Sequence, residues 1–148
     1  MKKMILFSFA ILVASVLFAQ KAEIFSASNV AIRGYDPVSY FKQGKPMKGK
    51  PQFSYTWRNA KWYFISQGNL NEFAKAPEKY APQYGGYCAY GCSNGYKAPT
   101  DPEAWTIVKG RLYLNYSKKV RSEWEKKRDE RIAQADKNWV LIRHKEKL

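Results

Sequence analysis

Two segments in which aromatic side chains alternate with polar ones limit the folds open to this chain. Residues 53–57 read Phe-Ser-Tyr-Thr-Trp, the period-two pattern of a strand with one buried face. A polar turn follows, and residues 62–65 return as a more buried strand, so the two predict a β-hairpin. Residues 105–108 and 111–116 repeat this arrangement around a Lys109-Gly110 turn. Aromatic residues make up 16% of the chain, and rings fill a compact core with few side chains.

Helices are predicted after each hairpin. Ser66 and Ser117 are suited to cap them, because a serine side chain accepts from the free backbone N–H groups of a first helical turn. Pro77 predicts another short turn of helix that reaches Tyr80. The C-terminal third is predicted as amphipathic helix with a break near Arg128, because apolar residues recur among its charges at near-helical spacing: Val120, Trp124, Ile132, Ala135, Trp139 and Ile142.

These elements together predict one α+β domain. We expect the two β-hairpins to form a single small antiparallel sheet, packed by helices and followed by a long C-terminal amphipathic helix. The inward positions of the hairpins and of the first helix predict the centre of the core: Trp62, Phe64, Phe73, Trp105 and Leu112.

The first residues have the features of an export signal. Met1-Lys2-Lys3 is a short positive start, and the apolar run 4–18 is shorter than the ~20 residues that span a bilayer. We expect cleavage after Ala19; the alternative is an uncleaved N-terminal anchor. The protein is then exported, periplasmic or secreted, with no transmembrane segment after cleavage. The expected division of the chain is a signal peptide (1–19), a flexible lead-in (20–29), a domain (30–139) and a charged tail (140–148).

The chain is strongly basic, with 26 Lys and Arg against 12 Asp and Glu and a net charge of +14. These charges are spread along the chain instead of forming an isolated basic stripe, which argues against a nucleic-acid partner. In an exported protein, such a charge fits an anionic component of the cell envelope or an ordinary solvated surface.

Several short blocks of aromatic, glycine and acidic residues follow one another along the chain: Gly34-Tyr35-Asp36-Pro37-Val38, Trp62-Tyr63-Phe64, Phe73, Pro77, Tyr80, Tyr84-Gly85-Gly86-Tyr87-Cys88-Ala89-Tyr90, Asp101-Pro102-Glu103-Ala104-Trp105, Gly110-Arg111-Leu112-Tyr113-Leu114-Asn115-Tyr116 and Asn138-Trp139. Together they resemble the exported YHS-domain proteins. The resemblance extends from Val30 to Trp139, over nearly all of the chain that follows the expected signal peptide.

The wider YHS superfamily is associated with heavy-metal handling, so the resemblance implies a role connected with metals. Its metal-linked members are similar in pattern but carry cysteines where this chain has Ser39, Ile65 and Asn69. Isoleucine cannot bind a metal ion, and neutral serine and asparagine are poor ligands for a soft one. We therefore expect the superfamily's metal site to be lost in this chain.

Cys88 and Cys92 are the remaining candidates for metal binding. If they lie on a helix, their four-residue spacing places both sulfurs on one face, where they can hold a soft ion such as Cu(I) in a two-coordinate site. Two alternatives stay open: a disulfide, which an exported location favours, and two thiols packed as small apolar groups. A zinc site of four Cys or His side chains from one chain is excluded, because the chain has two Cys and one His.

Other candidates for catalysis or binding are weak. The single histidine, His144, lies in the charged tail, Asp36 is placed to cap a helix, and Asp101 with Glu103 reads as a turn and only weakly as a pair of ligands for a hard metal. A group of tyrosines can either line a pocket for a flat ligand or pack in the core: Tyr80, Tyr84, Tyr87, Tyr90 and Tyr96.

The sequence therefore predicts an exported, non-enzymatic YHS-domain binding protein linked to copper-like metal homeostasis through Cys88 and Cys92. The alternative is a structural or interaction module of the cell envelope without ligand chemistry.

Overall fold

The computed structural model describes residues 22–145, so the expected signal peptide lies outside the described residues. Four short or medium strands and three α-helices occupy the first part of the chain, with a 3-10 turn, η1 (Ile32–Gly34), between the second strand and the first helix. These elements are β1 (Ser26–Ala27), β2 (Val30–Ala31), α1 (Ser39–Lys42), β3 (Lys50–Trp57), β4 (Ala60–Phe64), α2 (Gln67–Lys75) and α3 (Pro77–Tyr80).

The second part of the chain begins with another 3-10 segment, η2 (Gln83–Gly86), and contains the second hairpin and three helices. These are α4 (Ala89–Ser93), β5 (Asp101–Val108), β6 (Arg111–Asn115), α5 (Lys118–Glu125) and α6 (Arg128–Ile142). The α+β class and the long C-terminal helix are confirmed. In the described part of the chain, no helix has the length and apolar character needed to cross a membrane.

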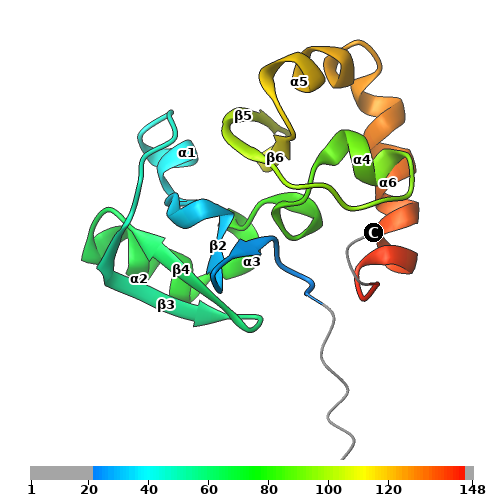
Figure 1. Ribbon diagram of the computed structural model, residues 1–148. Coiled ribbons are helices and arrows are strands. Elements are labelled where there is room, and N and C mark those ends of the chain that lie inside the picture. The colour runs from blue at the N-terminus through cyan, green and yellow to red at the C-terminus, as the bar shows by residue number, and fades with distance from the viewer. Residues whose placement is uncertain (1–21, 146–148) are drawn as a thin grey trace, which may run out of the picture.

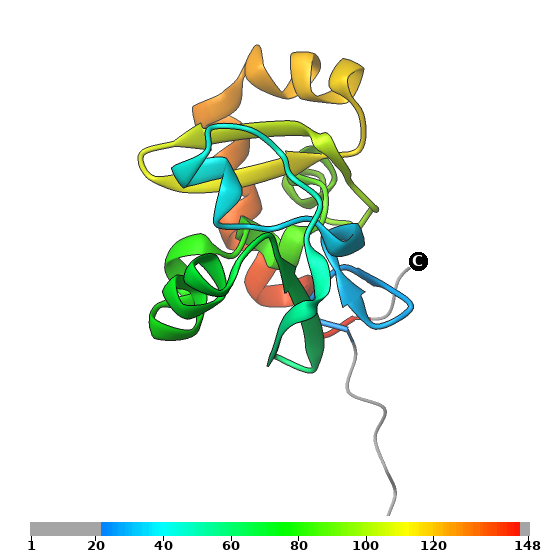
Figure 2. The ribbon, with the colours of Figure 1, turned by 90° about the vertical axis from the view of Figure 1, so that its left-hand side faces the viewer.

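The two hairpins lie in separate sheets, which differs from the single sheet expected. The first sheet has the order β1-β2-β4-β3, with β2 parallel to β4 and the other pairs antiparallel, whereas β5 and β6 pair only with each other. The second hairpin cannot pair with β4, because both edges of β4 are already occupied, by β3 on one side and by β2 on the other, where Val30 lies opposite Lys61. Figures 1 and 2 both show the second hairpin, with α5 beyond it, at the opposite end of the molecule from the first sheet.

Residues 22–29, the described part of the segment expected as a flexible lead-in, belong to the fold. Ile24 and Phe25 are each only 3% exposed, and the backbone N–H of Phe25 donates to the carbonyl of Gly85 at 2.8 Å. Ile24 belongs to the core beneath the first sheet and Phe25 to the core against the C-terminal helices. This apolar pair contributes to both cores, which differs from a loose lead-in.

The predicted core residues are buried around one another. Trp62, Phe64 and Phe73 are completely buried, and the Phe73 ring centroid lies 5.1 Å from that of Trp62 and 5.2 Å from that of Phe64. Leu112 of the second hairpin is buried in the same cluster, and the half-buried Trp105 packs against it. The prediction is confirmed for Trp62, Phe64, Phe73 and Leu112, whereas Trp105 is only half-buried, and side chains of both hairpins lie in one core.

The second core joins η2, the second hairpin and the C-terminal helices. Its largest fully buried members are Trp124, Tyr87 and Tyr113, and the Tyr113 ring centroid lies 5.4 Å from that of Trp124. The helix α6 reaches Ile142, which is 5% exposed, so the domain extends beyond the expected boundary at residue 139. This burial continues the apolar face of α6 by one turn.

Serine caps begin the helices that follow each hairpin. The Ser66 hydroxyl accepts from the backbone N–H of Asn69 at 3.2 Å, and the Ser117 hydroxyl accepts from that of Val120 at 3.1 Å. Both bonds satisfy donors that a helix leaves free at its N-terminus. The predicted break in the C-terminal third is also confirmed, because α5 ends at Glu125 and α6 begins at Arg128.

Candidate functional site

The two cysteines lie at the start of the short helix α4. Cys88 is its N-cap, and Cys92 follows one turn later, with its backbone N–H donating to the carbonyl of Cys88 at 2.9 Å. Both are free thiols, and they are 2% and 0% exposed. The two buried thiols therefore lie at the first turn of α4, but the backbone of Cys88 itself is not helical (φ −58°, ψ 119°), so the pair differs from the expected placement of both cysteines on one helix face.

Backbone donors and one amide surround the sulfur of Cys88. The N–H groups of Tyr116 and Gly91 donate to its Sγ at 3.3 and 3.5 Å, and the thiol donates to Asn115 Oδ1 at 3.5 Å. The same Oδ1 accepts from the N–H of Tyr90 at 3.0 Å, which orients the Asn115 amide. Its Nδ2 is buried and has no hydrogen-bond partner among the described residues. The sulfur therefore lies among N–H donors, which stabilise a thiolate.

Burial nevertheless keeps both thiols protonated at neutral pH. Desolvation raises the pKa of Cys88, against the backbone hydrogen bonds that lower it. Desolvation raises the pKa of Cys92 to about 12, and the nearby Cys88 contributes in the same direction. Without a bound ion, the pair behaves as two packed neutral thiols.

Ser39, Ile65 and Asn69, the positions expected to replace the superfamily's metal-linked cysteines, meet around one buried carboxylate. Asp36 is completely buried, and its Oδ2 accepts from the Ile65 N–H at 2.9 Å and from Asn69 Nδ2 at 2.8 Å. Its Oδ1 accepts from the N–H groups of Val38 at 2.8 Å and Ser39 at 3.3 Å. Desolvation raises the pKa of Asp36, although these four hydrogen bonds act against it. A hydrogen-bonded carboxylate thus occupies the place where those positions converge.

The weaker candidates are dispersed over the molecule. Asp101 Oδ1 accepts from the backbone N–H of Glu103 at 2.9 Å, as a turn residue does, and His144 is exposed near the C-terminus. Within residues 22–145, no group of three or more His, Cys, Asp or Glu side chains is arranged to hold a metal ion. The five tyrosines do not share one pocket: Tyr80 and Tyr87 are core residues, whereas Tyr96 is 42% exposed.

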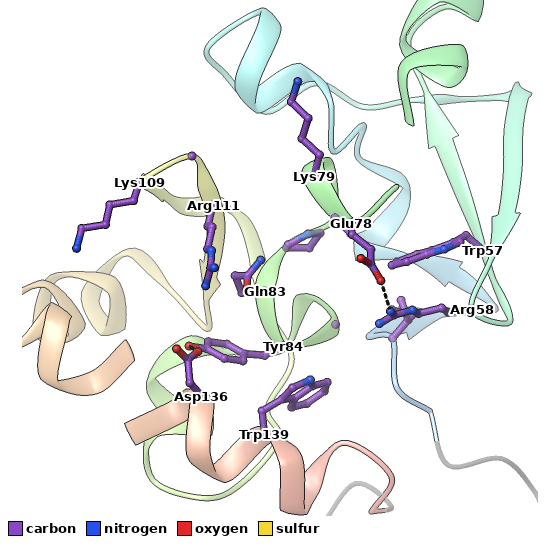
Figure 3. A pocket seen from close by; sticks show the side chains of 15 residues that line it. Trp57, Arg58, Glu78, Lys79, Gln83, Tyr84, Lys109, Arg111, Asp136 and Trp139 are labelled. Atoms are coloured by element: carbon purple, nitrogen blue, oxygen red, sulfur yellow. Dashed lines mark hydrogen bonds and ion pairs between the residues drawn. The ribbon is translucent and has the colours of Figure 1, made fainter. Parts of the chain in front are cut away.

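A cleft that the sequence did not predict lies between the first sheet and the C-terminal helix (Figure 3). Its volume is about 650 Å³, within the range of small-molecule sites. Of the tyrosines, Tyr84 lines it, and the Tyr84 hydroxyl donates to Asp136 Oδ1 at 2.9 Å. The polar and aromatic side chains around it come from four separate parts of the chain: Trp57, Arg58, Glu78, Lys79, Gln83, Lys109, Arg111, Asp136 and Trp139. No periodicity or motif connects these positions, so the amino-acid sequence alone does not indicate the cleft.

Comparison with protein families gives one match. Residues 38–84 match the YHS domain, from the residue before α1 to Tyr84 in η2. No curated protein and no solved structure matches the chain. The matched segment contains β3, β4, α2 and α3, together with Ser39, Ile65 and Asn69, whereas both cysteines follow it in sequence. The protein therefore contains a YHS domain at residues 38–84.

Proposed function

We propose that this protein is an exported, non-enzymatic binding protein that holds a soft monovalent ion such as Cu(I) between Cys88 and Cys92 and takes part in metal homeostasis. The observation that supports this function best is the placement of two buried thiols on one turn of α4, with backbone N–H groups directed at the Sγ of Cys88.

The chemistry of this pair favours Cu(I) over zinc. Cu(I) accepts two thiolate ligands, whereas Zn²⁺ takes four, and the described residues offer no cluster of three or more ligands. Two thiolates around Cu(I) leave one negative charge at the site. The backbone N–H donors at the Cys88 sulfur are suited to compensate that charge.

Binding at this site must be strongly pH-dependent. Both thiols are protonated at neutral pH, so a bound ion displaces two protons. The apparent affinity should then increase by up to about a hundredfold for each unit of pH below the thiol pKa values. A metal site made of surface carboxylates would not show this pH dependence near neutral pH, because carboxylates are already ionised there.

The test is a competitive Cu(I) titration of the reduced protein against a chromophoric chelator, under anaerobic conditions. Cys88→Ser and Cys92→Ser should each abolish tight binding. Serine suits the N-cap position of Cys88, so the first variant should keep the fold. Met47→Leu is the matched control, because it removes another soft ligand and should leave the affinity unchanged. Tight binding that survives both cysteine substitutions, or no binding by the reduced protein, would contradict the proposal.

The second candidate is an interaction module of the envelope. It is favoured by one observation on α6: Val140 and Leu141 are 66% and 70% exposed, and they are followed by the basic Arg143 and Lys145. An apolar pair beside positive charges suits an anionic lipid surface. Co-sedimentation with phosphatidylglycerol vesicles, and loss of it in the Val140→Ser and Leu141→Ser double variant, would support this function. Equal binding to neutral phosphatidylcholine vesicles, or equal binding by the variant, would argue against it.

A further inference from the structure

The cleft between the YHS domain and the C-terminal helix is formed by both parts of the chain. One side carries Trp57 and the Arg58–Glu78 ion pair, from the matched segment. The other side carries Arg111 from the second hairpin and Asp136 from α6, with Tyr84 between them (Figure 3). A YHS domain alone therefore could not form this site.

The charges of the cleft are not balanced. Arg58 is neutralised, because it pairs with Glu23 at 3.1 Å and with Glu78 at 2.9 Å. Three further cations line the cleft and have no ion-pair partner within residues 22–145: Lys79, Lys109 and Arg111. Of the two acidic residues that line the cleft, Glu78 is paired with Arg58, so Asp136 alone offsets the charge of these three cations. The excess positive charge favours an anionic ligand.

The side chains of these three cations point in different directions. Figure 3 shows Arg111 directed toward Gln83, Tyr84 and Asp136, whereas Lys79 and Lys109 extend from the rim. A guanidinium binds carboxylate, phosphate or sulfonate groups through two parallel N–H bonds. Arg111, which is exposed at the mouth of the cleft, is therefore the group placed to bind an anion there, and the lysines raise the local potential.

An indole ring lines the same cleft, with Tyr84 between it and Arg111 (Figure 3). Trp139 is half-buried, and its ring centroid lies 6.1 Å from that of Tyr84, at an interplanar angle of 62°. The Trp139 ring also lies 6.2 Å from that of Tyr87, between centroids, and the Lys97 Nζ lies 5.6 Å from its centroid. Asp136 lies one turn earlier on α6 and accepts from the Tyr84 hydroxyl, so this bond holds α6 and η2 together. The indole is thereby oriented before any ligand arrives, which reduces the entropy cost of binding.

We propose that this cleft is a binding site for a small anionic molecule that carries a flat ring, with its charged group on Arg111 and its ring against Trp139. Both interactions are required, because the guanidinium recognises the charge and the indole provides the apolar contact. The site is separate from the cysteine pair, and neither Cys88 nor Cys92 lines it.

The first experiment measures the binding of two dyes that share a ring system. Anilinonaphthalenesulfonate is anionic and phenylnaphthylamine is neutral, and both fluoresce more strongly in an apolar site. We expect saturable binding of one anionic dye per chain, and binding of the neutral dye weaker by about tenfold or more. Arg111→Gln should lower the affinity for the anionic dye by about tenfold or more. The matched control, Arg143→Gln, replaces an exposed arginine outside the cleft and should change this affinity by less than about twofold.

The second experiment locates the dye and tests the ligand class. The chain has five tryptophans, so NMR spectra resolve their indole N–H signals. The anionic dye should shift the signals of Trp139 and Trp57, and leave that of the fully buried Trp124 in place. Phenyl phosphate should displace the dye at lower concentrations than inorganic phosphate or phenol. Three results would overturn the proposal: an unchanged Trp139 indole N–H signal, equal affinity of the protein for both dyes, or an equal loss of affinity for the anionic dye in the two arginine variants. Cys88→Ser should bind the dye normally, which separates this result from that of the metal titration.

Discussion

Replacing Asp36 with asparagine tests whether its carboxylate organises the YHS domain. Asparagine has almost the same shape and keeps the oxygen that accepts from Val38 and Ser39. The oxygen that accepts from the Ile65 N–H and from Asn69 Nδ2 becomes an amide NH₂. The Ile65 N–H and the Asn69 amide then face another N–H donor, and each loses the acceptor that Asp36 Oδ2 provided.

The magnitude follows from these two bonds. A hydrogen bond to a charged acceptor contributes about 1.5–3 kcal/mol, so two of them contribute about 3–6 kcal/mol. Part of this loss is offset, because asparagine avoids the burial of a charge, whose cost is visible in the raised pKa of Asp36. We expect Asp36→Asn to lower the free energy of unfolding by about 2–4 kcal/mol, a large share of the stability of an ordinary domain.

Urea unfolding followed by tryptophan fluorescence measures this loss at neutral pH. Glu103→Gln is the control, because the Glu103 side chain is exposed, and it should change the stability by less than about 0.5 kcal/mol. Adding Asn69→Asp to Asp36→Asn restores one donor–acceptor pair, since the new amide at position 36 can donate to the new carboxylate at position 69. The double variant should recover about 1 kcal/mol or more. A loss below about 1 kcal/mol in the single variant would refute the role of Asp36.

Three further predictions concern the core, the thiols and export. Phe64→Ala removes a completely buried ring and should cost about 3–5 kcal/mol in the same urea experiment, whereas a loss under about 1 kcal/mol would contradict the packing of β4 on α2. Because the pKa of each thiol is raised above its ordinary value near 9, Cys88 and Cys92 should react with iodoacetamide at about pH 9 roughly tenfold more slowly in the folded than in the urea-unfolded protein. The stability that protonated Cys92 contributes is present below about pH 9 and is lost as the pH rises through its folded pKa of about 12. Fast labelling of the thiols, or greater stability at high pH, would argue against their burial. Sequencing the N-terminus of protein from cell fractions should find Gln20 first in the exported fraction, and an intact Met1 in the cytosol would argue against export.

Local structure could be predicted from short stretches of sequence. The alternation of residues 53–57 determines which side chains of β3 face the sheet's buried side, and this depends only on the period of a strand. Ser66 and Ser117 begin helices because each hydroxyl bonds a backbone N–H three residues later. The predicted core followed from the same local patterns, since the inward faces of hairpins and helices have to be covered by one another.

The pair Ile24 and Phe25 shows where such reasoning stops. Two apolar residues within a polar segment have no period, and a loose lead-in is the ordinary interpretation of such a segment. Their burial depends on surfaces formed by distant parts of the chain, among them Gly85, whose carbonyl accepts from Phe25.

The sequence by itself determined the hairpins, the helix starts, the break before α6 and the presence of two thiols one helical turn apart, because each of these depends on residues within a few positions of one another. Only the tertiary structure decided which strand edges pair, how Ile65 and Asn69 meet on Asp36 from 29 and 33 positions away, and how Arg111 and Trp139 come to line one cleft with Trp57. Such contacts depend on the packing of whole elements. The free energy that selects them is a property of the complete core, and no short segment contains it.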